Sequence, residues 1–216
     1  MSFEAYDDYE QSERVQKWLR QNGLSIVVGI ALGLVAIFGW QQWRNHKSGH
    51  QAEAAQIYQQ IQNALLTNKA DTADALIEQM YKDYADTTYA VFAASGRAQR
   101  QAQAKQWDKA LASLGWAESH ATDPQLKSLT QLRMAQVALA QGKPADALAT
   151  LDRMPAKSYE VLSQELRGDV LVKLGRADDA RQAYQAAKSA MGEDAPQNGA
   201  LQTKIDDLAT AGKQGA

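Results

Sequence analysis

A charge-free stretch near the start of this 216-residue chain constrains what the rest of it can fold into. The stretch covers residues 21–43, and its central part reads LSIVVGIALGLVAIFGW. At about 1.5 Å of helical rise per residue it spans about 34 Å, whereas the hydrocarbon core of a bilayer is about 30 Å thick. It therefore predicts one transmembrane helix over residues 22–43, anchored by apolar and aromatic side chains that include Leu24, Ile30, Phe38, Trp40 and Trp43.

Two other structures compete for the same stretch. A buried core helix can be this apolar, but such helices are usually shorter and have an apolar partner of similar length. A cleaved signal peptide ends in small residues at its cleavage site, whereas this run ends in Gly39, Trp40, Gln41, Gln42 and Trp43. Indole rings at the end of an apolar run are typical of the membrane interface, which favours an uncleaved anchor.

The basic residues that flank the run give it an orientation. Three of them, Arg14, Lys17 and Arg20, precede it, and only Arg44 and Lys47 follow it closely. Positive charge is enriched on the cytoplasmic side of membrane helices. We therefore expect residues 1–21 to form a cytoplasmic N-terminal tail and residues 44–216 to form a domain outside the cytoplasm. Because the margin is narrow, a domain that faces the cytoplasm is the alternative.

Composition excludes several functions for residues 44–216. They contain 20 basic and 20 acidic side chains, so they have no net positive charge of the kind that binds nucleic acid. The chain has no cysteine, which excludes thiol catalysis and disulfides. His46 and His50 are four residues apart, but no third ligand accompanies them, so we predict no metal site and no cofactor. Without a nucleophile elbow or phosphate loop, we also expect no enzyme activity.

Beyond residue 51 the sequence predicts helices alone. Turn-forming residues recur every 15 to 20 positions, and no alternation typical of strands occurs. Asp123 followed by Pro124 predicts the start of a helix. Near the C-terminus, the polar segment GEDAPQNG of residues 192–199 predicts a linker, and residues 200–209 predict a closing helix. The fold class is therefore all-α.

Two segments of this half repeat at one fixed period. Residues 131–151, QLRMAQVALAQGKPADALATL, align with residues 164–184, QELRGDVLVKLGRADDARQAY. In this alignment Gly142 matches Gly175, and Ala147 matches Ala180. A weaker copy, at a slightly longer spacing, places Ala110 in the position of Ala147. The pattern resembles tetratricopeptide repeats, which are 34-residue helical hairpins, so we expect a tetratricopeptide-like helical-hairpin solenoid after the membrane helix.

A solenoid of this kind has a concave face lined by the first helix of each hairpin. The repeat register predicts which side chains face that groove. They combine apolar residues, which give affinity to a bound peptide, with polar residues, which fix its position. The predicted partner-binding residues are Phe92, Gln99, Leu129, Leu132, Gln136, Leu139, Leu162, Glu165, Asp169 and Lys173.

Three segments together resemble one known family. The anchor region VQKWLRQNGLSIVVGIALGLVAIFGWQQWRNH, residues 15–46, is similar to the membrane anchor of the YfgM family of Gram-negative bacteria. The segments LKSLTQLRMAQVALAQGKPADALATLD and LRGDVLVKLGRADDARQAY are similar to the helical repeats of that family. The resemblance implies an inner-membrane protein with a short cytoplasmic N-terminus and a tetratricopeptide-like domain in the periplasm.

The same resemblance implies a function. Members of the YfgM family are ancillary subunits of the SecYEG translocon and associate with the periplasmic chaperone PpiD. A similar protein would help to pass translocated polypeptides to periplasmic chaperones. Its partners would be SecYEG and PpiD, with the translocating polypeptides themselves as further candidates. Two alternatives remain, a general membrane-attached scaffold for another envelope complex and a regulatory adaptor that faces the cytoplasm.

Overall fold

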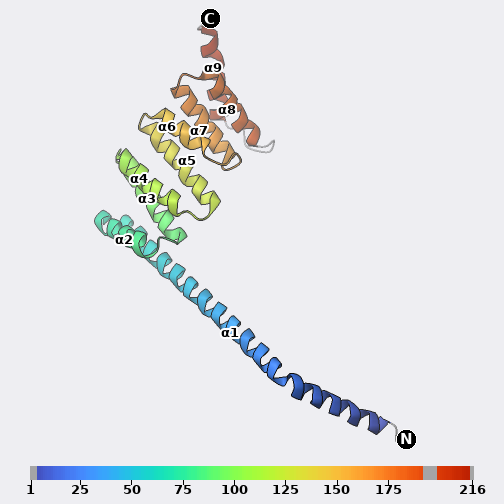
Figure 1. The fold of residues 1–216 in the computed structure, drawn as a ribbon. Helices are drawn as coiled ribbons and strands as arrows, with labels where there is room; N and C mark the ends of the chain where they lie inside the picture. The colour runs from blue at the N-terminus through green and yellow to red at the C-terminus, as the bar shows by residue number, and fades with distance from the viewer. Residues whose placement is uncertain (1–3, 192–198, 215–216) are drawn as a thin grey trace. The chain divides into compact units, whose positions relative to one another are not determined.

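The computed structural model describes residues 4–191 and 199–214, and every regular element within them is a helix. The all-α prediction is thus confirmed for this part of the chain. The helices are α1 (Glu4–Leu66), α2 (Ala70–Asp83), α3 (Thr88–Gln103), α4 (Trp107–His120), α5 (Pro124–Ala140), α6 (Pro144–Asp152), α7 (Glu160–Lys173), α8 (Ala177–Ala190) and α9 (Gly199–Gln214), as Figure 1 shows.

The chain divides into two compact units, Met1–Ala52 and Glu53–Ala216, and the long helix α1 belongs to both. In the first unit, the five predicted anchor residues Leu24, Ile30, Phe38, Trp40 and Trp43 are all exposed on α1. The rings of Trp40 and Trp43 lie 5.5 Å apart between their centres. Residues 44–52 continue α1 without a break.

A membrane span requires a helix that is both long and apolar enough to cross the bilayer. Among the described residues, no single helix meets both requirements. One pair of helical segments, Gln16–Ser25 and Val27–Leu66, meets them when taken together, and these two segments are bent by 41° with respect to each other.

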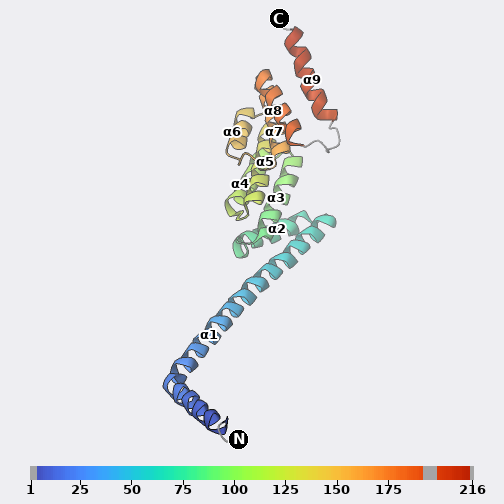
Figure 2. The same ribbon diagram turned by 90° about the vertical axis from the view of Figure 1, so that its right-hand side faces the viewer.

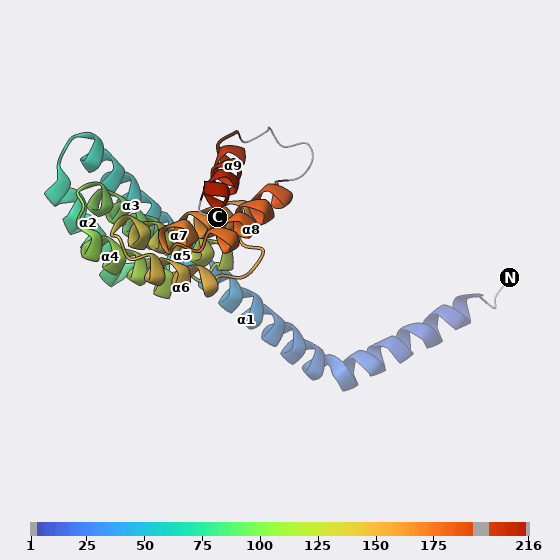
Figure 3. The same ribbon diagram turned by 90° about the horizontal axis from the view of Figure 1, so that it is seen from above.

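The second unit is a stack of helical hairpins (Figure 2). Residues 53–66 of α1 pack with α2 in the first hairpin, and α3 with α4, α5 with α6, and α7 with α8 form the next three. Seen from above, α4 and α6 lie along one face of the stack, and α3 and α5 lie along the other (Figure 3). The closing helix α9, predicted over residues 200–209, packs against α8 through Leu201. The linker predicted before it falls, apart from Gly199, outside the described residues.

Each hairpin turns at a residue with a left-handed backbone. These four residues are Asn68, Lys105, Gly142 and Gly175, with φ of 57°, 56°, 81° and 75°. After each of them, the next N–H bonds back to a carbonyl five residues earlier, for example Lys143 to Ala138 at 2.9 Å and Arg176 to Leu171 at 2.9 Å. This Schellman geometry satisfies the last carbonyl groups of the first helix and reverses the chain.

A small residue recurs early in the second helix of every hairpin. It is Ala73, Ala110, Ala147 or Ala180, and each of these side chains is completely buried. The residue four positions later is a larger core residue: Ile77, Leu114, Leu151 or Tyr184. Alanine lets the two helices of a hairpin approach closely, and the larger residue fills the space beside them. The predicted repeat is therefore present four times, at nearly even spacing along the chain.

Candidate functional site

The exposed apolar side chains of the hairpin stack gather on its first helices. Among the described residues from 53 onward, the large apolar side chains with high exposure are Leu66 (80%), Phe92 (40%), Leu162 (52%) and Val172 (42%). They lie on α1, α3 and α7, and none lies on α2, α4, α6 or α8. Apolar side chains that are exposed to water on these helices are available to a protein partner. We call the exposed side of residues 53–66, α3, α5 and α7 the groove face.

Nine of the ten predicted partner-binding residues are accessible on these helices. Five are exposed, namely Phe92, Gln99, Gln136, Leu162 and Lys173. Four are half-buried, namely Leu129, Leu139, Glu165 and Asp169. The tenth, Leu132, is 2% exposed and packs in the core with Ala135 and Leu151. It offers no surface to a partner in this structure.

The burial of Leu132 follows from its position in the repeat. Ser95, which occupies the same register position in the preceding hairpin, is also buried. Glu165, its counterpart in the following hairpin, is half-buried and accepts a hydrogen bond from Lys204 of α9 at 2.9 Å. This position therefore faces the neighbouring helix of the stack, whereas the side chains of Phe92 and Gln99 are exposed.

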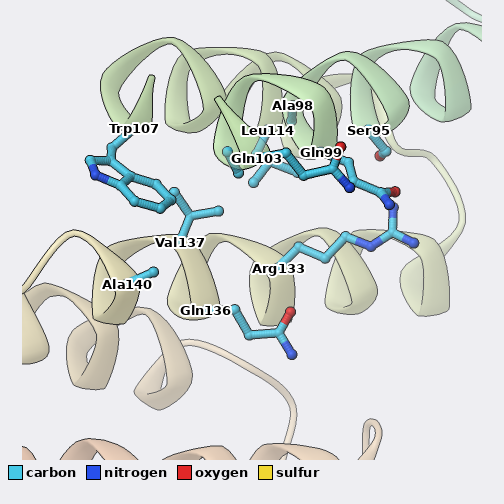
Figure 4. A pocket seen from close by; sticks show the side chains of 11 residues that line it. Ser95, Ala98, Gln99, Gln103, Trp107, Leu114, Arg133, Gln136, Val137 and Ala140 are labelled. Atoms are coloured by element: carbon cyan, nitrogen blue, oxygen red, sulfur yellow. The ribbon is translucent and has the colours of Figure 1, made fainter. Parts of the chain in front are cut away.

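A pocket of about 400 Å³ opens on the groove face between α3 and α5 (Figure 4). This volume lies at the lower end of the range of about 300–1,000 Å³ that is typical of ligand pockets. Its wall is mainly apolar, formed by Ala98 and Ala102 of α3, Trp107 and Leu114 of α4, and Val137 and Ala140 of α5. The small alanines leave the space that the indole of Trp107 closes at one end. We call this cavity the groove pocket.

The polar part of the same pocket consists of three amides, one cation and the hydroxyl group of Ser95. Gln99 and Gln103 come from α3, and Arg133 and Gln136 come from α5. Arg133 and Gln99 point towards each other, whereas Gln136 points to the side of α5 that is away from α3 (Figure 4). No acidic side chain lines the pocket. It therefore offers hydrogen-bond donors and acceptors for a peptide backbone and one positive charge for an anionic group.

Three aromatic residues of α1 and α3 lie close together on the groove face. Tyr58 of α1 lies 5.9 Å from Tyr89 and 6.3 Å from Phe92, measured between ring centres. Such tilted arrangements are favourable between aromatic side chains. We call these three residues the aromatic platform. Because Phe92 remains exposed, the platform presents an apolar surface next to the groove pocket.

A lysine of α9 pairs with two carboxylates of α7 in the last hairpin. Lys204 of α9 lies 2.9 Å from Glu165 and 2.7 Å from Asp169, and Asp169 also accepts a hydrogen bond of 2.7 Å from the hydroxyl of Tyr184. Burial lowers the pKa of Lys204, but hydrogen bonds to Asp169 and Glu165 outweigh it and raise that pKa above 10.5. Glu165 and Asp169 thus hold the closing helix against α7.

A second cavity, of about 590 Å³, lies between α6, α7 and α8. Its charged side chains are already paired, since Arg167 bonds to Asp152 at 2.6 Å and Arg176 to Asp179 at 2.7 Å. Paired charges offer less to a ligand than the single cation of the groove pocket. In the part of the chain whose side chains are described, which excludes His46, no group of three or more ligand-type residues could hold a metal ion.

Two of the ten predicted partner-binding residues, Gln99 and Gln136, line the groove pocket, and Arg133 was not among the ten. Its side chain points across the stack to the neighbouring hairpin (Figure 4), so its role depends on packing between repeats. One feature could have indicated it. Leu166 occupies the same register position in the next hairpin. An arginine at a position where the next repeat has leucine indicates that the environment of this side chain differs between the two hairpins.

Comparison with known proteins adds family evidence to this geometry. A family model described as a tetratricopeptide repeat-like domain matches residues 16–210. The chain is 30% identical over 181 residues to the ancillary SecYEG translocon subunit of Escherichia coli, with 83% of this chain and 86% of the relative covered. It is 29% identical over 186 residues to the protein of the same name from Haemophilus influenzae, with 85% and 91% covered. The protein of that name from Neisseria gonorrhoeae is 27% identical over 194 residues, with 89% of each chain covered.

Proposed function

Because the chain belongs to the YfgM family of tetratricopeptide repeat-like proteins, we propose that it is an ancillary subunit of the SecYEG translocon that acts as a non-enzymatic adaptor. The observation that carries the proposal is the similarity to relatives of that name over most of both chains. The groove face supports it, because exposed apolar side chains on stacked hairpins suit the binding of a protein partner.

The proposed anchor is a single membrane helix over residues 22–43 in the inner membrane. The charge-free run supports it by length and composition, and the exposure of Leu24, Ile30 and Phe38 supports it because lipid-facing side chains have no protein partner. The basic residues before the run favour a cytoplasmic tail of residues 1–21 and a periplasmic domain of residues 44–216.

The proposed action is to receive polypeptides near the exit of the channel and help pass them to the chaperone PpiD. Tethering a domain beside its partner raises the effective concentration to the millimolar range. Weak contacts on the groove face would then be occupied for a useful fraction of the time. The proposal needs no site for nucleic acid, in keeping with the balanced charge of residues 44–216.

Site-specific photo-crosslinking in intact membranes tests this function. A photoreactive amino acid would replace Ile30 in the proposed anchor, or Phe92 or Gln136 on the groove face. A matched control would carry it at Ala112, which is exposed on α4. We expect adducts with SecYEG from position 30, and adducts with PpiD or translocating chains from positions 92 and 136. Adducts only with an unrelated envelope complex would contradict the proposal and favour a general scaffold.

Orientation can be tested separately because the chain contains no cysteine. A single Ala112→Cys substitution would be labelled with a maleimide that does not cross membranes. In spheroplasts, we expect labelling without detergent, since the domain would face the medium. A Ser2→Cys variant in the N-terminal tail would be labelled only after lysis. The opposite pattern would support an adaptor that faces the cytoplasm.

A further inference from the structure

We propose that the groove pocket binds an extended polypeptide segment that places an apolar side chain between α3 and α5 and a carboxylate against Arg133. This inference rests on the proposed function, since it specifies the kind of polypeptide that the adaptor would receive. It concerns one pocket with defined walls, and the affinity of that pocket can be measured without the translocon.

The apolar part of the ligand follows from the walls. Ala98, Ala102, Val137 and Ala140 surround a space that Trp107 closes at one end. At about 400 Å³, the pocket has room for one large apolar side chain and the backbone next to it. Transfer of such a side chain from water into the apolar pocket would favour binding.

The charge of the ligand follows from Arg133. Residues 53–216 contain seven arginines, and six of them lie within 4.0 Å of an aspartate or glutamate: Arg97, Arg100, Arg153, Arg167, Arg176 and Arg181. Arg133 makes no ion pair with any described residue, and it lines a pocket without acidic side chains. A guanidinium group binds a carboxylate through two parallel hydrogen bonds. An acidic group in the ligand is therefore the chemical complement of this pocket.

The carboxamide side chains of the pocket indicate which backbone conformation of the ligand would fit. Gln99 and Gln103 lie along α3, and Gln136 lies on α5 at the edge of the pocket. Each carboxamide can both donate and accept, so the two on α3 can pair with the N–H and C=O groups of an extended chain. A folded partner has already paired most of these backbone groups. The polar edge thus favours an unfolded segment.

The aromatic platform indicates how far a second apolar side chain of the ligand lies from the one that enters the pocket. Phe92 and Gln99 are seven residues apart on α3, which corresponds to about 10 Å along the helix. An extended chain covers that distance in about three residues. The preferred segment therefore has two apolar residues about three positions apart, with an acidic residue next to the one that enters the pocket.

The test is the binding of two matched peptides to the full chain in a mild detergent, followed by fluorescence anisotropy. One decapeptide carries leucine and phenylalanine three positions apart, glutamates on both sides of the phenylalanine, and otherwise glycine and serine. Its twin has glutamine in place of both glutamates. We expect the acidic peptide to bind about tenfold more tightly, and Arg133→Gln to abolish this preference while the affinity for the neutral peptide is kept.

The matched control is Lys127→Gln, which removes one positive charge from an exposed position on the same helix. Lys127 lies about 180° around α5 from Gln136, at about 100° per residue, so this variant should keep the preference. Equal affinity of wild-type protein for both peptides, or an equal loss of preference in Lys127→Gln, would overturn the role of Arg133.

A second pair of variants tests the pocket itself and does not depend on Arg133. Ala140 is exposed at the edge of the pocket, so Ala140→Phe fills the cavity without entering the core. We expect it to weaken both peptides at least tenfold, whereas Ala112→Phe on α4 should leave both affinities unchanged. If Ala140→Phe binds like wild type, or if wild-type protein binds neither peptide, the inference is wrong. Crosslinks from Ile30 to SecYEG would still stand in that case, so the two proposals can fail separately.

Discussion

Gly168 of α7 lies against the ring of Tyr184 in α8, so closely that a Cβ atom on residue 168 would overlap the ring. The other hairpins have alanine or isoleucine at this register position and a smaller side chain opposite, as in Ala135 with Leu151. The glycine and the tyrosine therefore compensate each other in volume. The ring fills the space that the missing side chain leaves, and the tyrosine hydroxyl bonds to Asp169 at 2.7 Å.

This close approach predicts that Gly168→Ala destabilises the domain. Overpacking of a filled core typically costs about 1–3 kcal/mol, which exceeds the gain of up to about 1 kcal/mol from replacing glycine by alanine in a helix. The free energy of unfolding should fall accordingly in denaturant titrations. Gly96→Ala in α3 is the control, because no atom beyond the adjacent residues and the local backbone of α3 lies within 4 Å of the new methyl group. It should raise stability by about 0.5–1 kcal/mol. The same sign for both substitutions would contradict this explanation.

The turn residues Lys105 and Gly142 predict opposite effects of substitution on the stability of the domain. Lys105 adopts a left-handed backbone with φ of 56°, at the same repeat position where Gly142 has φ of 81°. A side chain with a Cβ atom is strained in this region by about 1–2 kcal/mol. Lys105→Gly should therefore raise the free energy of unfolding by about 0.5–1 kcal/mol, whereas Gly142→Ala should lower it by about 1 kcal/mol. Chemical denaturation at neutral pH measures both, and a stability loss in Lys105→Gly would disprove the strain at this turn.

The repeat that these turns define was only partly predictable from sequence. Gly142 and Gly175 revealed the last two hairpins, because glycine at a turn is a visible pattern. The first hairpin turns at Asn68, and the second turns at Lys105, which has no turn-forming character of its own. Their backbone is set by the Schellman hydrogen bonds and by the packing of Ala73 and Ala110. At Lys105, tertiary packing therefore imposed a backbone conformation that the local sequence does not favour, whereas asparagine at position 68 adopts it readily.

The candidate site, like the repeat, was only partly predictable from sequence. Helical periodicity located Phe92, Gln99 and Gln136 on the accessible side of their helices. It could not show that Leu132 is covered, because the side chains that cover it come from other helices. Nor could it show that Arg133 lacks an acidic partner, since the ion pairs of the other arginines include contacts between helices, such as Arg167 with Asp152 and Arg153 with Glu118. Both facts depend on how the helices pack in space.

The contact between α9 and α7 predicts a loss of stability in alkali. Burial and the hydrogen bond to Asp169 raise the pKa of Tyr184 above its ordinary value of 10.0. The pKa of Lys204 also lies above its ordinary 10.5, since bonds to Asp169 and Glu165 outweigh the opposing effect of burial. Above about pH 10, the unfolded chain releases these protons while the folded chain still holds them. The stabilisation is therefore fully present below about pH 10 and is lost as pH rises towards the folded-state pKa values.

Denaturant titrations between about pH 9 and pH 12 would measure this loss. The double variant Tyr184→Phe with Lys204→Met removes both titrating groups, so its stability should decline less steeply over this range than that of the wild type. It should also start from a lower value at the lowest pH, because the bonds to Asp169 are gone. A decline as steep as that of the wild type would mean that other groups cause the alkaline transition.

The aromatic platform predicts a local effect on ligand binding. Phe92→Ala should weaken the acidic decapeptide by about fivefold to tenfold, because the ring is 40% exposed and contributes apolar area to a ligand rather than to the core. The stability of the domain should change little for the same reason. Leu162→Ala, which removes an exposed side chain from α7, should change the affinity less than about twofold. Similar losses in both variants would mean that the ligand extends along the whole groove face.

The proposed anchor predicts that one charge added at its centre strongly reduces the retention of the protein in membranes. Ile30 lies near the centre of the charge-free run, and an arginine at the centre of a membrane helix costs about 2.5–3.5 kcal/mol of insertion free energy. Ile30→Arg should therefore lower the fraction of protein that stays in membranes after alkaline carbonate extraction. Gln42→Arg adds the same charge at the end of the run, where the side chain can reach the lipid head groups, so it should behave like the wild type. Equal extraction of the two variants would show that residues 22–43 do not cross the bilayer, and the adaptor would then need another means of staying close to its partner.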